Sequence, residues 1–114
     1  MRNEIKYVMP FFVLAIIFGC ASNNSNLPPG TIQKGSLSNQ QLIKDAMVGV
    51  SQKMVVLGCN KPESYEPYII SMPQGHVGSR FWKELWVVKG CNSHYSIHIT
   101  FSEDGPYAAN YTVE

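Results

Sequence analysis

The chain of 114 residues has almost no net charge. Its nine basic and eight acidic side chains leave a formal charge of +1. A chain so close to neutral has no long-range field with which to gather nucleic acid or anionic lipid. We therefore expect no nucleic-acid partner, and any attachment to a membrane has to come from apolar groups.

Long apolar runs are also missing. The most hydrophobic run, residues 7–19, has only 13 residues and contains Pro10, whereas a membrane-spanning helix needs about 20. The run follows Arg2 and Lys6 and ends on a glycine directly before Cys20. A basic start, a short apolar core and a small residue before the cut are typical of a secretory signal peptide.

The tetrad Ile17-Phe18-Gly19-Cys20 resembles the lipobox of bacterial lipoproteins. The resemblance implies that the Cys20 thiol is lipidated, that the chain is cut before it, and that acyl chains such as palmitate anchor the mature protein. It also implies the outer membrane, facing the periplasm, if the cell is Gram-negative, because Ala21 is not Asp. An ordinary signal peptide is the alternative, since signal peptidase also cuts after small residues.

The chain divides into three regions. Residues 1–19 are the signal peptide, residues 20–37 are the lipidated cysteine and a flexible tether, and residues 38–114 form one small domain. The tether is rich in Asn, Ser, Pro and Gly, a composition that buries little surface.

Cysteine is scarce, and its three copies have a simple assignment. Lipid takes Cys20, which leaves Cys59 and Cys91 in an exported domain. An oxidising compartment favours a disulfide between them. The bond would close a loop of about 33 residues and stabilise the domain by about 3–4 kcal/mol.

The periodicity of apolar residues predicts one helix and four strands. Helical spacing covers residues 39–57, after an S-x-x-Q capping box headed by Ser38 and before Gly58, although residues 54–57 also fit a strand. Short connections favour antiparallel pairing. The fold class is therefore α+β, with one N-terminal helix packed on a small, mainly antiparallel four-stranded sheet, and one disulfide. The expected strands are residues 68–72, 80–89, 94–101 and 107–113.

Patterns for catalysis and metal binding are lacking. Cys91, His94 and His98 have the side chains of a zinc site, but on a strand the two histidines would lie about 13 Å apart, too far to share one ion. His76 and Ser79 have no acidic partner and no nucleophile motif. We therefore expect no metal, no cofactor and no enzymatic activity.

The loop at residues 73–80 is the best candidate for a binding surface. It has two glycines and few apolar residues, so folding alone does not account for His76 and Arg80. Arginine is also enriched at interface hot spots. Trp82 follows on the next strand, on the same face as Trp86, either beside the binding surface or in the core. The candidate residues are therefore His76, Arg80 and Trp82.

Together these features predict a lipid-anchored protein of the bacterial envelope with a small binding or structural domain. Its expected partners are the membrane, through the anchor, and an envelope protein or cell-wall glycan. The alternative is an inhibitor of an attacking hydrolase, of the lysozyme-inhibitor type, that acts through one exposed loop. A small enzyme ranks last, because no ionisable residues converge in the sequence.

Overall fold

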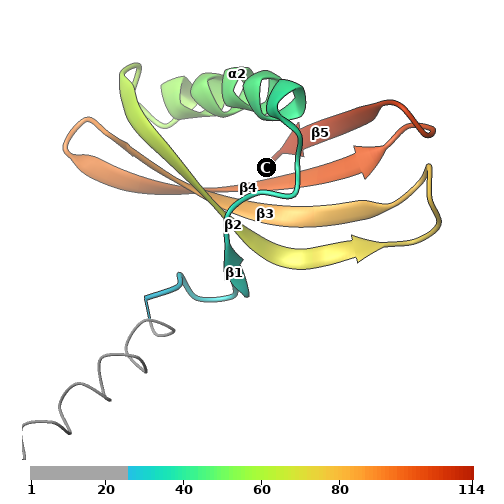
Figure 1. Ribbon diagram of the computed structural model, residues 1–114. Coiled ribbons are helices and arrows are strands. Elements are labelled where there is room, and N and C mark those ends of the chain that lie inside the picture. The colour runs from blue at the N-terminus through green and yellow to red at the C-terminus, as the bar shows by residue number, and fades with distance from the viewer. Residues whose placement is uncertain (1–25) are drawn as a thin grey trace, which may run out of the picture.

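The computed structural model of the protein describes residues 26–114. One antiparallel sheet contains all five strands in the order of the chain, and helix α2 lies across one of its faces (Figure 1). The predicted signal peptide and Cys20 lie outside the described residues. The elements are β1 (Gln33–Lys34), α2 (Gln40–Val56), β2 (Pro62–Gln74), β3 (Phe81–Gly90), β4 (Ser93–Glu103) and β5 (Ala109–Val113).

The expectation of a four-stranded sheet with an N-terminal helix is wrong. A fifth strand, β1, precedes the helix and pairs with β2 through Gln33 and Lys34. Two backbone hydrogen bonds flank the pair, from the Ile32 amide to the Ile69 carbonyl and from the Gly35 amide to the Pro67 carbonyl, each 2.8 Å. Strands are predicted from the alternation of apolar and polar side chains, and two exposed polar residues show none. Strand β1 is held by its backbone hydrogen bonds, so its sequence gives no sign of it.

The predicted helix is confirmed, with one change at its start. The N-cap is Asn39, whose side-chain oxygen accepts a hydrogen bond of 2.8 Å from the Leu42 amide, and Ser38 lies one residue outside it. The helix continues to Val56, so the segment that also fitted a strand is helical. Gly58 has φ +98°, the left-handed conformation that glycine adopts after a helix C-terminus.

Strand β2 is much longer than predicted, because it runs through Pro67. The carbonyl of Pro67 accepts from Gly35, on the β1 side. The N and O atoms of one strand residue point to the same side, so the proline nitrogen faces the sheet edge where β1 ends. No ladder hydrogen bond to β3 is lost there, which is the setting in which strands tolerate proline.

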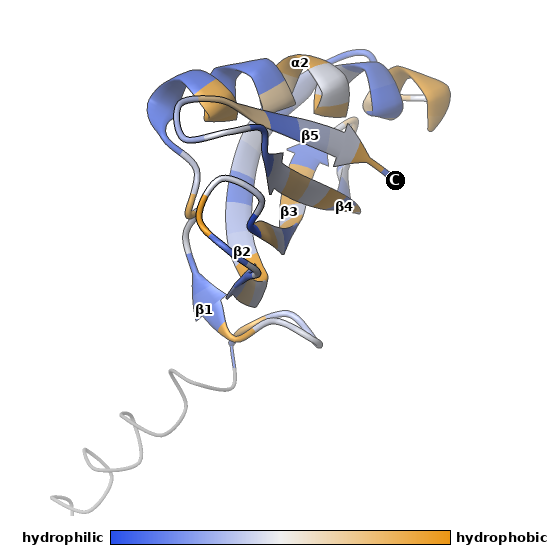
Figure 2. Ribbon diagram, turned by 90° about the vertical axis from the view of Figure 1, so that its right-hand side faces the viewer, coloured by the Kyte–Doolittle hydropathy of each residue, from blue (hydrophilic) through white to orange (hydrophobic). Residues whose placement is uncertain are grey.

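The core lies between α2 and the sheet. The buried helical side chains recur every four residues, and apolar and polar positions alternate along the ribbon of α2 (Figure 2). Both Trp82 and Trp86 face the helix. His94 and His98 lie on the opposite face of the sheet, and both are exposed. The core contains Leu42, Ala46, Val50, Met54, Trp82, Trp86, Val88, Ile97, Ile99 and Phe101.

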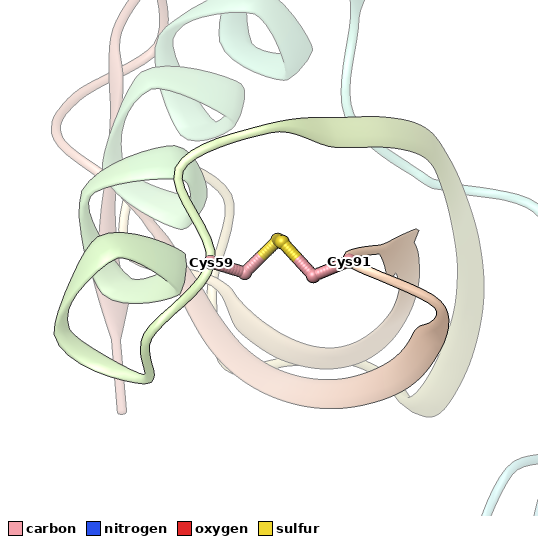
Figure 3. The surroundings of a disulfide bond; sticks show 2 residues. All are labelled: Cys59 and Cys91. Atoms are coloured by element: carbon pink, nitrogen blue, oxygen red, sulfur yellow. A yellow bond between two sulfur atoms is a disulfide. The ribbon is translucent and has the colours of Figure 1, made fainter.

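The predicted disulfide between Cys59 and Cys91 is confirmed (Figure 3). Cys59 is buried just after α2, and Cys91 lies in the two-residue turn between β3 and β4, with a Cα–Cα distance of 5.8 Å. Cys91 and Asn92 have φ +52° and +59°, as a type I′ hairpin turn requires. The bond ties the C-terminal end of the helix to the central hairpin.

Glu84 is the one charged side chain that is fully buried among the described residues. It lies in the middle of β3, between the indoles of Trp82 and Trp86, and each indole N–H donates to it at 2.9 Å. From the β1–α2 connection, the Ser36 hydroxyl lies 2.8 and 2.9 Å from its two oxygens and the Leu37 amide donates at 2.9 Å. The carboxylate therefore fastens the β1–α2 connection to the centre of the sheet.

Replacing Glu84 by Gln should destabilise the domain by about 1–3 kcal/mol. Both oxygens of Glu84 accept hydrogen bonds, whereas the glutamine side chain has one oxygen and one NH2 group. That NH2 group would face a buried donor, and the donor would be left without an acceptor. In a domain of this size this lowers Tm by roughly 4–8 °C per kcal/mol. Glu66→Gln is the matched control, because Glu66 lies at the surface in an exposed ion pair with Lys34 and a glutamine there can still accept from Tyr68. It should leave Tm nearly unchanged. Equal Tm shifts for the two variants in thermal unfolding would contradict this role of Glu84.

Candidate functional site

Two loops meet at the end of the domain opposite the disulfide (Figure 1). One is the β2–β3 loop, residues 75–80, and the other is the β4–β5 loop, residues 104–108. The Gly105 amide donates to the Gly78 carbonyl at 2.9 Å, which joins them directly. We call these two joined loops the loop edge.

Glu103, the last residue of β4, holds the loop edge in place. Its two oxygens accept from the Nε and Nη2 atoms of Arg80 at 3.0 and 2.7 Å. The backbone amides of Gly78 and Arg80 also donate to it, at 2.9 and 3.0 Å. A two-pronged arginine contact and two amides on one carboxylate make a charge-assisted network, so the β2–β3 loop is rigidly attached to β4.

This network shifts the ionisation of both partners. The Arg80 guanidinium, helped by the two amides, lowers the pKa of Glu103 from its ordinary value of 4.5 to about 2, although partial burial acts in the opposite direction. The carboxylate in turn raises the pKa of Arg80. Both groups are therefore charged at neutral pH, and the contact is an ion pair.

The three predicted binding residues occupy different surroundings. His76 is exposed in the β2–β3 loop, where its carbonyl accepts from the Ser79 amide at 2.8 Å. Arg80 belongs to the same loop, but its guanidinium is engaged by Glu103. Trp82 points to the helix side, stacks on Phe101 with ring centroids 5.4 Å apart and is 7% exposed. His76 and Arg80 thus share the loop edge, and Trp82 lies beside it in the core.

The sequence patterns did not single out the two large apolar side chains that are exposed on the loop edge. Val77 is 77% exposed and Tyr107 is 97% exposed. Val77 precedes Gly78, which has a positive φ, and Tyr107 follows the Gly105-Pro106 turn. Glycine and proline of this kind are the sequence signals that indicate an exposed turn. The loop edge therefore combines a rigid polar base with apolar tips.

The residues first weighed for metal binding are spread out. Within residues 26–114, no three His, Cys, Asp or Glu side chains lie close enough together to hold a metal ion. Cys91 is bonded to Cys59, and His94 and His98 are exposed on the face of the sheet opposite α2. The same part of the chain contains no helix with the length and apolar character needed to cross a membrane.

Comparisons with protein-family models, with curated proteins and with solved structures found no match to this chain.

The Glu103–Arg80 pair predicts a specific acid sensitivity. Because the pKa of Glu103 is lower in the folded state, the pair stabilises the fold above pH 4.5, and this contribution is lost as the pH falls from 4.5 to about 2. Glu103→Gln removes the contribution. The Tm of the wild type should exceed that of the variant at pH 6–7. The difference between the two Tm values should become smaller as the pH falls from 4.5 to about 2. A gap that stays constant down to pH 2 would contradict the ion pair.

Proposed function

We propose that the protein is a lipid-anchored component of the bacterial envelope that binds an envelope protein through its loop edge. The lipobox-like tetrad that ends in Cys20 and the parity of the cysteines support the anchor and the export. The contact surface rests on one observation, the rigid attachment of the β2–β3 loop to β4 by Glu103. The proposal assigns no catalytic role to the domain.

Rigid loops suit this role because they lose little conformational entropy on binding. The Gly105–Gly78 hydrogen bond and the Arg80–Glu103 pair fix the loop edge before a partner arrives. The tips then offer a valine side chain and a tyrosine ring, and tyrosine is enriched at interfaces and hot spots. Polar His76 would lie at the rim of such a contact.

Inhibition of an attacking hydrolase is the second candidate function. The observation that favours it is the shape of the loop edge, in which two bonded loops project from one end of the sheet with apolar tips (Figure 1). A preorganised projection of this kind fits the concave site of an enzyme. The partner would then be a muramidase-type hydrolase instead of an envelope component.

The anchor has a direct test in cell fractionation. Cys20→Ser removes the thiol that would carry the lipid, so the variant should appear in the soluble fraction or remain as the unprocessed precursor. Mass spectrometry of the wild-type N-terminus should show a modified Cys20. A variant that is cut at the same place and still sediments with the membranes would contradict lipidation.

The contact surface has a test with two matched valines. Val77→Asp places a charge at the tip of the loop edge, whereas Val48→Asp makes the same change on the outer side of α2, where Val48 is 58% exposed. In chemical crosslinking of intact cells, Val77→Asp should reduce the crosslinked protein partner about tenfold, and Val48→Asp should not. Equal yields would place the contact elsewhere. If the purified wild-type protein inhibits a muramidase and the Val77→Asp variant does not, the result would favour the hydrolase-inhibitor function.

A further inference from the structure

A groove of about 600 Å³ runs between the first turns of α2 and the β4–β5 loop. Its size falls within the roughly 300–1,000 Å³ of sites for small ligands. Leu42 and Trp82 contribute apolar surface, and the indole N–H of Trp82 is already donated to Glu84, so this ring offers only its surface. The polar lining includes Gln41, Asp45 and Glu103.

The β4–β5 loop places an aromatic ring at this groove. Tyr107 lines the groove and is 97% exposed. A hydrogen bond of 2.8 Å from the Asp104 amide to the Ala108 carbonyl closes the loop around it, and Gly105 ties the loop to Gly78. The ring therefore stands on a fixed backbone beside a hollow.

The charges of the groove restrict the ligand. The lining contains two carboxylates and no Lys, Arg or His, so an anionic ligand would be repelled. The charge of Glu103 is matched by Arg80. Asp45 accepts one hydrogen bond, at 2.9 Å from the Gln41 side chain, and it can accept others. The groove thus offers hydrogen-bond acceptors, an amide and aromatic surface, and one of its two carboxylates is already paired with a cation.

Such a lining fits a sugar ring. A pyranose has an apolar C–H face that packs on an aromatic ring, and a rim of hydroxyl groups that donate to carboxylates and amides. We propose that the groove binds a pyranose unit of an uncharged glycan, with Tyr107 against the ring and Asp45 and Gln41 on its hydroxyls. This goes beyond the proposed protein contact and depends neither on that contact nor on the lipid anchor.

The test is a fluorescence titration of the full chain in detergent with two oligosaccharides, an N-acetylglucosamine tetramer and a β-glucose tetramer. Trp82 lines the groove, so occupancy should change the tryptophan emission in a saturable way. A response to the first tetramer alone identifies an amino-sugar glycan of the cell-wall type, and a response to both identifies a general pyranose site. Tyr107→Ala should weaken binding about tenfold, and Tyr107→Phe, which keeps the ring, should restore it.

Val77→Asp is the control that separates this site from the protein contact, and it should leave the sugar titration unchanged. A lack of saturable response to both tetramers up to about 10 mM, or equal binding by the wild type and Tyr107→Ala, would overturn the proposal. A pentalysine peptide forms the last arm. The peptide could bind in a salt-sensitive way that Asp45→Asn abolishes, while neither sugar binds. That result would also overturn the pyranose proposal and would identify a site for cationic peptides.

Discussion

The arrangement of this domain depends on one buried carboxylate. Glu84 lies in the middle strand with 0% exposure. Its donors come from two parts of the chain, the β1–α2 connection and the two tryptophans of its own strand, Trp82 and Trp86. Removing a charge from water is costly unless hydrogen bonds replace the lost hydration. The β1–α2 connection, which supplies the Ser36 and Leu37 donors, is therefore bound to the sheet, and the start of α2 is positioned with it.

The effect of Glu84 extends to the groove beside α2. The N-cap Asn39 lies two residues beyond Leu37, so the carboxylate fixes where the helix begins and thereby one wall of the groove. It also fixes the orientation of the Trp82 indole, which contributes to the groove. At the same end of the domain, Glu103 attaches the β2–β3 loop to β4. One carboxylate therefore organises the interior, and a second organises the surface beside it.

Periodicity in the sequence revealed the parts of the fold that bury side chains at regular intervals. The helix, the central strand and the alternation from Tyr95 to Phe101 all follow from such packing. The two-residue strand β1 is held by backbone hydrogen bonds, which leave no pattern in the sequence. The predicted strand in the β2 region was too short, because a proline such as Pro67 normally marks a loop. The pairing of Arg80 with Glu103 spans 23 residues and leaves no local signal, so the sequence suggested Arg80 as a contact residue without its partner.

Pro67, which made β2 hard to predict, also affects whether the sheet edges of two molecules can pair. Strand β1 covers only Tyr68 and Ile69 of β2, so much of that edge is open to another strand. Pro67 presents no N–H there, and the charged pair of Lys34 and Glu66 lies beside it, with a distance of 3.1 Å between Nζ and Oε2. Missing donors and charged side chains discourage pairing between sheet edges. The edge is therefore protected against aggregation where molecules are crowded together.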